Sequence, residues 1–289
     1  MPAGRSRGLL YALAGAGAVA GAATARLAYA AFTRNRPAEL SSRWTRKNHR
    51  GEPITLLEGP AFVAGSAAAA AVTPGLPGRL RAAALIAGTG SGALGAYDDL
   101  YGTTDSKGFK GHLSALARGQ VTSGAVKILG IGATGLVSAA LVSRGPVDTL
   151  VNGATIAGAA NLANLFDLRP GRAVKVGLLT GGPLLAASVL RDRPAAAALA
   201  AVPLGAAAAL LPDDLGERAM LGDAGANSLG ALLGLAAVVG LGKPGRYAVL
   251  GTVVALTAAA EKVSFTKVIA GNPVLNRIDM LGRRPAESV

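Results

Sequence analysis

Long apolar stretches alternate with short polar connections along the whole chain. The stretches are apolar on every helical face, whereas a transmembrane β-barrel requires alternation at every second position. A helix crosses the hydrocarbon core with ~20 residues, in a range of roughly 17–25, and several of these stretches are near the lower limit. The pattern therefore predicts an all-α fold, a polytopic membrane helix bundle of about nine transmembrane helices. The predicted spans are residues 9–32, 54–73, 80–97, 121–142, 150–166, 174–190, 195–211, 221–241 and 247–260.

The first stretch is longer than the core of a signal peptide and lacks a cleavage site of the usual kind, which favours a retained span. We expect residues 1–289 to form a single integral membrane domain, in which 261–289 is a cytoplasmic C-terminal tail. Only 16% of the 289 residues are charged and 51% are hydrophobic, whereas about a quarter of a soluble domain is charged. The chain has no cysteine and two histidines, which excludes disulfides and leaves little room for a His-based metal centre.

Alternating the connections across the membrane separates the charges. One side then holds 18 of the 29 Lys and Arg residues, counting Lys175 at the edge of its span, and the other side holds 9. Because basic excess marks the cytoplasmic side, the N-terminus is expected outside and the C-terminus inside. The net charge of +13 is thus explained by orientation, and nucleic acid is not an expected partner. The basic side comprises residues 33–53, 98–120, 167–173, 212–220 and 261–289.

The acidic residues segregate even more strongly, since only Asp148 and Asp192 of 16 fall on the outer side. Acidic residues contribute little to topology, so a polar active-site cleft at the cytoplasmic face is the simplest explanation. Asp98, Asp99 and Asp167 each end a predicted span, where the helix dipole disfavours a carboxylate. A divalent cation or a ring of basic side chains would offset that cost; the alternative is that these acids are merely solvated.

Asp223 opens the eighth predicted span, where it is either an N-cap or part of a site. We expect the nearby acids Asp213, Asp214 and Glu217 to lie in a solvated loop. Lys127 lies within an apolar stretch, where a charge is costly and usually functional, although a lysine there can also snorkel.

The first basic connection contains Lys47 and Arg50 and is either a positive-inside anchor or a phosphate cradle. Two glycine patterns, at residues 90–95 and 130–135, fit a dinucleotide fingerprint. They lie in apolar stretches outside any βαβ unit, so helix packing explains them better.

Three acidic motifs in order resemble those of one enzyme family. Asp98-Asp99 ends one span, the sequence NLFD at 164–167 ends another, and MLGDAG at 220–225 opens a third. Together with the sequence RGEP at 50–53 and the stretch from Lys107 to Lys127, they resemble the polyprenyl-phosphate N-acetylhexosamine-1-phosphate transferases. That family includes phospho-MurNAc-pentapeptide translocase and UDP-GlcNAc:undecaprenyl-phosphate GlcNAc-1-phosphate transferase. The similarity covers roughly residues 45–235.

The resemblance implies Mg²⁺-dependent transfer of a sugar-1-phosphate from a UDP-sugar to a polyprenyl phosphate, with release of UMP, in the bacterial cytoplasmic membrane. It implies undecaprenyl or another polyprenyl phosphate and a UDP-sugar as partners, with a homodimer as one possible assembly. The implied roles are shared among nine residues. These are the catalytic Asp98, Asp99 and Asp167, the Mg²⁺ ligand Asp223, and the substrate-binding Lys127, Asn161, Asn164, Lys47 and Arg50.

The chain also departs from the family pattern. The family motif Asp-Gly-x-Asp-Gly reads Asp167-Leu168-Arg169-Pro170-Gly171 here, so its second acid is absent. Residues 261–289 contain no histidine, whereas the family carries a late histidine cluster, and a tenth span is missing. A relative that binds polyprenyl phosphate or acts as a scaffold without turnover is therefore an alternative. A transporter is a weaker one, because these acids lie at one membrane border rather than at the midplane.

Overall fold

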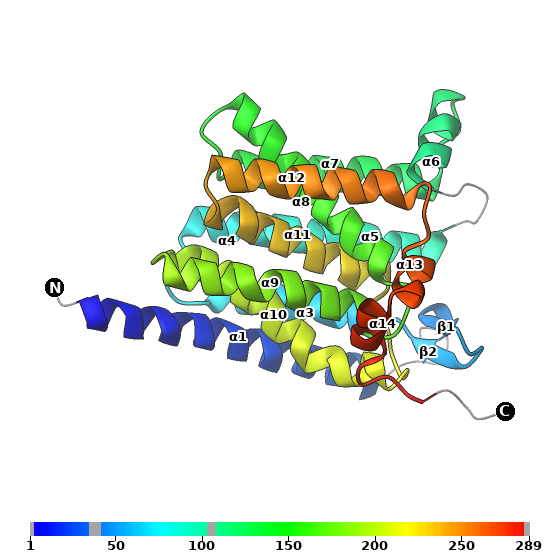
Figure 1. The fold of residues 1–289 in the computed structure, drawn as a ribbon, viewed down its shortest axis with the longest axis horizontal. Coiled ribbons are helices and arrows are strands. Elements are labelled where there is room, and N and C mark those ends of the chain that lie inside the picture. Colours follow the sequence, from blue (N-terminus) through cyan, green and yellow to red (C-terminus); the bar gives the residue numbers. More distant parts are fainter. Residues whose placement is uncertain (1–2, 35–41, 103–107, 286–289) are drawn as a thin grey trace.

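The computed structural model describes residues 3–34, 42–102 and 108–285, and helices dominate it. The long helices run side by side along the longest axis of the molecule (Figure 1). Helix α1 begins at one end of this bundle, whereas β1, β2, α6, α13 and α14 gather at the other end. The all-α prediction is confirmed.

The described part of the chain contains short strands only in one hairpin, between α1 and α3. In chain order the elements are α1 (Ala3–Arg34), β1 (Thr45–Lys47), β2 (Pro53–Thr55), α3 (Glu58–Val72), α4 (Gly78–Leu85), the π-helical turn η1 (Ile86–Gly90), α5 (Ser91–Tyr101), α6 (Gly108–Ala117), α7 (Ser123–Ala140), α8 (Pro146–Phe166), α9 (Arg172–Leu190), α10 (Pro194–Leu215), α11 (Gly222–Gly240), α12 (Lys243–Ala260), α13 (Phe265–Gly271) and α14 (Pro273–Met280). Each predicted apolar stretch coincides with one helix, except the third, which is divided into α4, η1 and α5.

Several helices are suited to a membrane. Among the described helices, α7, α9, α10 and α11 are long and apolar enough to cross one, and α12 with α13 would make a fifth despite a 95° bend between them. Other predicted spans fall short for visible reasons: α3 has 15 residues, about 22 Å of helix, and α8 carries several asparagines. The helices thus indicate a membrane protein, while the count of nine spans stays a prediction.

Helix α11 forms the centre of the bundle and contacts α3, α5, α8, α9 and α10. Most of its residues are buried, and small residues let its neighbours approach closely. A Cβ atom at Gly95 of α5 would overlap the backbone carbonyl of Asp223. Glycine at this position therefore allows the C-terminal end of α5 to meet the N-terminal end of α11.

Candidate functional site

Lys127 joins two acidic residues from other helices. Its Nζ atom lies 2.6 Å from Asp98 Oδ2 on α5 and also bonds Asp223 Oδ2 on α11. The exposed fractions of the three side chains are 14%, 18% and 26%. Lys127 therefore points into the protein, so the snorkelling alternative is wrong. We call Lys127, Asp98 and Asp223 the Lys127 centre.

The N-terminus of α11 is capped by a residue from a different helix. Asp99 Oδ1 accepts a hydrogen bond from the Asp223 amide at 3.1 Å, and Asp99 Oδ2 accepts one from the Ala224 amide at 3.0 Å. Leu221, at the N-cap position, makes no side-chain cap. Of the two alternatives for Asp223, the N-cap is therefore wrong, because Asp99 provides that cap and Asp223 bonds Lys127.

Asp167 supports the same helix end. It follows α8 and is 6% exposed, and the nearby Gly222 backbone amide favours the charged form of its carboxyl group. The first helical amides have no partner within their own helix, and the positive end of the dipole favours carboxylates. Gly222 has a φ of +60°, and a Cβ atom there would lie 3.0 Å from Asp99 Oδ2. Glycine is therefore required where the two capping acids meet α11.

The first connection reaches this region through Arg46 on β1, which donates a hydrogen bond to the backbone carbonyl of Asp99. A cation is favourable at the C-terminal end of α5 because unpaired carbonyls and the negative end of the dipole lie there. Arg46 thus ties the β1–β2 hairpin to the end of α5 beside the Lys127 centre.

A groove leads away from the Lys127 centre between α7, α8, α11 and α12. Its volume is about 490 Å³, and most of its lining is apolar, with Ile131, Ala157, Leu250 and Val254 among the contributors. Val254 is 58% exposed, so the groove reaches the outer surface of the bundle. In a membrane that surface faces lipid, and an acyl or prenyl chain could enter from the side.

The groove also carries polar groups. Lys127, Asn161, Asn227 and Thr257 line it. The Asn227 side-chain amide donates to the Asp223 carbonyl at 2.6 Å, while Asn227 Oδ1 and Thr257 Oγ1 are buried with no hydrogen-bond partner among the described residues. Buried polar atoms normally have partners, so these two atoms are free to bind a polar group of a ligand. The sequence analysis missed Asn227 and Thr257.

In the described part of the chain, Asn164 and Lys47 make no hydrogen bond or ion pair with the Lys127 centre. Asn164 is half-buried near the end of α8, and its backbone carbonyl accepts a bond from the Asp167 amide. Lys47 is exposed on β1. Lys107 falls outside the described residues, and His112 bonds Thr122 Oγ1 at 2.9 Å.

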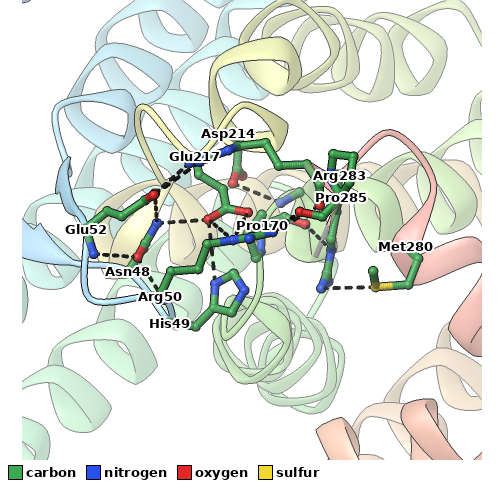
Figure 2. Close-up of polar contacts among 12 residues, drawn as sticks. Asn48, His49, Arg50, Glu52, Pro170, Asp214, Glu217, Met280, Arg283 and Pro285 are labelled. Carbon is green, nitrogen blue, oxygen red and sulfur yellow. Dashed lines mark hydrogen bonds and ion pairs between the residues drawn. The ribbon is translucent and has the colours of Figure 1, made fainter. Parts of the chain in front are cut away.

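Arg50 is engaged elsewhere. Its Nε atom lies 3.1 Å from Glu217 Oε2, and its Nη2 atom donates to the carbonyls of Arg284 and Pro285 at 3.0 and 2.9 Å (Figure 2). It therefore joins the hairpin to the chain's C-terminal tail, and the structure does not bring it together with the Lys127 centre.

His49 lies beside the same carboxylate, with 3.9 Å between Nδ1 and Glu217 Oε2. Burial lowers the pKa of His49, and the nearby guanidinium groups of Arg169 and Arg50 lower it further, although Glu217 opposes them. His49 is consequently neutral at pH 7 and adds no positive charge to the hairpin.

Four buried acids near this end of the bundle were not expected. Asp213, Asp214 and Glu217 are 7%, 2% and 5% exposed, so the expectation of a solvated loop is wrong. Asp213 and Asp214 lie in the last turn of α10 and Glu217 follows that helix; Asp214 accepts a hydrogen bond from the Gly171 amide at 2.8 Å. Glu58 is fully buried, and neither carboxyl oxygen has a hydrogen-bond partner among the described residues. We have no physical account of Glu58.

The donor set at the Lys127 centre suits a magnesium ion. Mg²⁺ is usually held by one or two carboxylates together with water and substrate phosphates. Asp98 and Asp223 both place an oxygen against the same cation, the Lys127 ammonium. No group of three acidic or histidine side chains in the described residues is arranged to hold a metal. The residues therefore fit Mg²⁺ bound jointly with a phosphate ligand better than a metal site made by protein alone.

Comparison with known proteins adds no assignment. No protein-family model matches the chain, and no curated protein is similar to it in sequence. The interpretation consequently depends on the residues and their geometry.

Replacing Lys127 with methionine should destabilise the protein strongly. The change leaves Asp98 and Asp223 facing each other without their shared cation. Removing one partner from a buried group of paired charges lowers the free energy of unfolding by about 2–3 kcal/mol. Adding Asp223→Asn to Lys127→Met should recover part of the loss, because it removes one of the two repelling charges. Thermal unfolding of the purified variants in detergent, followed by circular dichroism, measures both effects. Strictly additive single changes would show that the three residues are not coupled.

Proposed function

We propose that this protein transfers a sugar-1-phosphate from a UDP-sugar to a polyprenyl phosphate and releases UMP, in the synthesis of a cell-envelope glycan. The observation that carries the proposal is the position of the Lys127 centre at an apolar groove open to the side of the bundle. A cation flanked by two carboxylates suits a phosphate and its metal ion. An apolar groove suits the chain attached to that phosphate. The acidic motifs that resemble the transferase family supply these same residues.

The proposed lipid lies with its phosphate at Lys127 and the first part of its prenyl chain in the groove. Prenyl chains are apolar and branched, and the lining of Ile131, Ala157, Leu250 and Val254 offers them aliphatic contacts. The rest of the chain stays in the bilayer, because the groove opens where α12 faces lipid. Asn227 Oδ1 and Thr257 Oγ1 are available for hydrogen bonds to the polar groups of either substrate.

In the proposed reaction, an oxygen of the polyprenyl phosphate attacks the β-phosphorus of the UDP-sugar. The bond from that phosphorus to the bridging oxygen breaks, and UMP leaves with this oxygen. Two anions must approach each other, so positioning and positive charge provide most of the catalysis. Lys127 supplies a positive charge, and Asp98 is within reach of a phosphate bound there and accepts its proton if it carries one. Asp99 and Asp167 hold the start of α11, and thereby Asp223, in place.

Asp223 would hold the Mg²⁺ that the family resemblance implies, together with water and substrate phosphate oxygens. When bound, the ion would neutralise phosphate charge in the transition state. Lys127 then remains available for the lipid phosphate, because its ammonium is a flexible point charge.

We further propose that the protein crosses a bacterial inner membrane with about nine spans and that the Lys127 centre faces the cytoplasm. The support is the basic excess in the connections at this end of the bundle. UDP-sugars are cytoplasmic metabolites, so this orientation gives the donor direct access.

A second candidate function is binding of polyprenyl phosphate without turnover. Two observations favour it: Lys127 is already paired with both Asp98 and Asp223, and both oxygens of Asp99 are committed to amides. The absent histidine cluster and second acid agree with it. Binding alone needs the groove and the Lys127 ammonium but no site for a UDP-sugar. Measuring turnover of UDP-sugars therefore separates the two candidate functions.

The purified protein should release UMP from at least one UDP-sugar when undecaprenyl phosphate and Mg²⁺ are present. A chelator should abolish the release, and Asp223→Asn should lower kcat about a hundredfold. Asp192→Asn is the matched control, since Asp192 is an exposed acid in the turn between α9 and α10 and its change should leave the rate intact. If no donor in a broad panel is turned over while the lipid phosphate still binds, the binding function is correct and the transferase is not.

A large side chain in the groove should weaken lipid binding selectively. Ala258 lines the groove, whereas Ala255 is exposed on the same helix and does not. We expect Ala258→Trp to raise the KM for polyprenyl phosphate about tenfold, a change of ~1.4 kcal/mol, with the KM for the UDP-sugar unchanged. Ala255→Trp should change neither constant. Equal effects of the two substitutions on the lipid KM would exclude the groove as the site of the prenyl chain.

A further inference from the structure

The C-terminal part of the chain turns sharply away from the bundle axis. Helix α13 is bent by 95° from α12 across a short break. Helix α14 follows directly and packs against α13. Because α12 runs along the long axis of the bundle, α13 runs nearly at right angles to that axis, and both α13 and α14 lie at one end of the bundle (Figure 1). In a membrane-spanning bundle this direction is close to the plane of the membrane surface.

The inward face of this segment is polar and firmly held. Asp279, 8% exposed, is paired by Arg172, with Nε–Oδ1 and Nη2–Oδ2 distances of 2.8 and 2.9 Å. Lys175 Nζ donates to the Asp279 carbonyl at 2.6 Å, and Arg283 Nε donates to the Pro170 carbonyl at 3.0 Å (Figure 2). Burial alone would raise the pKa of Asp279, but the bonds and charges of Arg172 and Arg283 bring it below the usual value.

The outward face is aliphatic. Val274 and Leu281 are 67% and 70% exposed, and Val268, Leu275 and Ile278 are also exposed. Large aliphatic side chains gathered on one face of a short helix mark a surface that contacts an apolar partner. Since the polar contacts occupy the opposite face, the segment is amphipathic with its apolar side turned away from the protein.

From residue 262 to residue 281 the exposed charges are basic, and the exposed acid Glu261 directly precedes them. Lys262, Lys267 and Arg277 are exposed, whereas Asp279, the acid between residues 262 and 285, is buried against Arg172. An aliphatic face combined with exposed Lys and Arg is typical of a helix in the membrane interface, where anionic headgroups attract the basic residues.

We infer that residues 262–281, the interfacial segment, lie in the headgroup layer of the membrane that the bundle crosses. Val274, Ile278 and Leu281 contact the upper acyl chains, and Lys262, Lys267 and Arg277 contact anionic headgroups. The segment is joined to the polar end of the bundle by the ion pair between Asp279 and Arg172. Arg284, which follows the segment, adds a contact to Glu52 of the hairpin at 2.5 Å. The inference needs membrane residence only, so it stands or falls separately from sugar-phosphate transfer.

Nitroxide labels can locate the interfacial segment, because the chain contains no cysteine and each label site is unique. The full-length protein, with Val274→Cys, Leu281→Cys or the control Arg43→Cys, is placed in nanodiscs containing phosphatidylglycerol. Arg43 is exposed before the hairpin. Labels at 274 and 281 should collide more often with oxygen than with a water-soluble nickel complex, and the label at 43 should show the reverse. Labels at 274 and 281 that meet the nickel complex as freely as the control would overturn the inference.

The lipid charge and a competing occupant are tested with the same labels. Changing Lys262, Lys267 and Arg277 to glutamine should move the labels toward water in phosphatidylglycerol discs and have little effect in phosphatidylcholine discs. An equal response in both lipids would overturn the role of anionic headgroups. Discs that hold one copy of the chain are then compared with discs that hold two. Protection of the labels that requires two copies, with spin–spin broadening, would assign the face to a second copy of the chain instead of lipid.

Discussion

The first backbone amides of α11 are buried among other helices, and they need hydrogen-bond partners from outside their own helix. Asp99, near the end of α5, accepts hydrogen bonds from two of these amides, and Asp167, which follows α8, lies against the same helix end. This requirement brings three helix ends to one point and determines which residues sit beside them. Asp98, next to Asp99, and Asp223, in the first turn of α11, then converge on Lys127 of α7. The polar centre is thus a consequence of how a buried helix end is paired.

The same convergence produces a site with two chemical halves. The Lys127 centre provides charge, and the groove between α7, α8, α11 and α12 provides an apolar channel open to the side. A ligand with an anionic head and a long apolar chain matches both halves, which is the basis for proposing polyprenyl phosphate. The C-terminal segment, held by Arg172 and Arg283, lies across the same end of the bundle and places a basic, aliphatic face where lipid headgroups would be.

Much of the helical framework follows from hydropathy, because a helix in lipid must be apolar over its length. The alternation of connections could also predict that Asp98 and Asp223 gather at one end of the bundle. Their pairing could not be predicted, because helical periodicity does not tell which faces of distant helices meet. Asp99 illustrates this limit: nothing in the local sequence shows that it caps a helix more than a hundred residues later.

The burial of Asp214 and Glu217 was mispredicted, because acids after an apolar stretch are usually solvated and their partners come from other segments. The ion pair between Arg172 and Asp279 could not be predicted either, because these two residues are also far apart in the chain.

The central claim is that Lys127 holds the phosphate of a prenyl lipid whose chain lies in the groove. Photo-crosslinking with a polyprenyl phosphate that carries a diazirine near its head, followed by peptide mapping, tests this claim most directly. The claim predicts adducts on groove residues of α8 and α12, such as Ala154, Leu250 and Val254. It also predicts that unlabelled polyprenyl phosphate displaces the probe, that polyprenol does not, and that Lys127→Gln removes most adducts. Adducts spread over the outer faces of α1 and α9, or adducts indifferent to the phosphate and to Lys127, would contradict it.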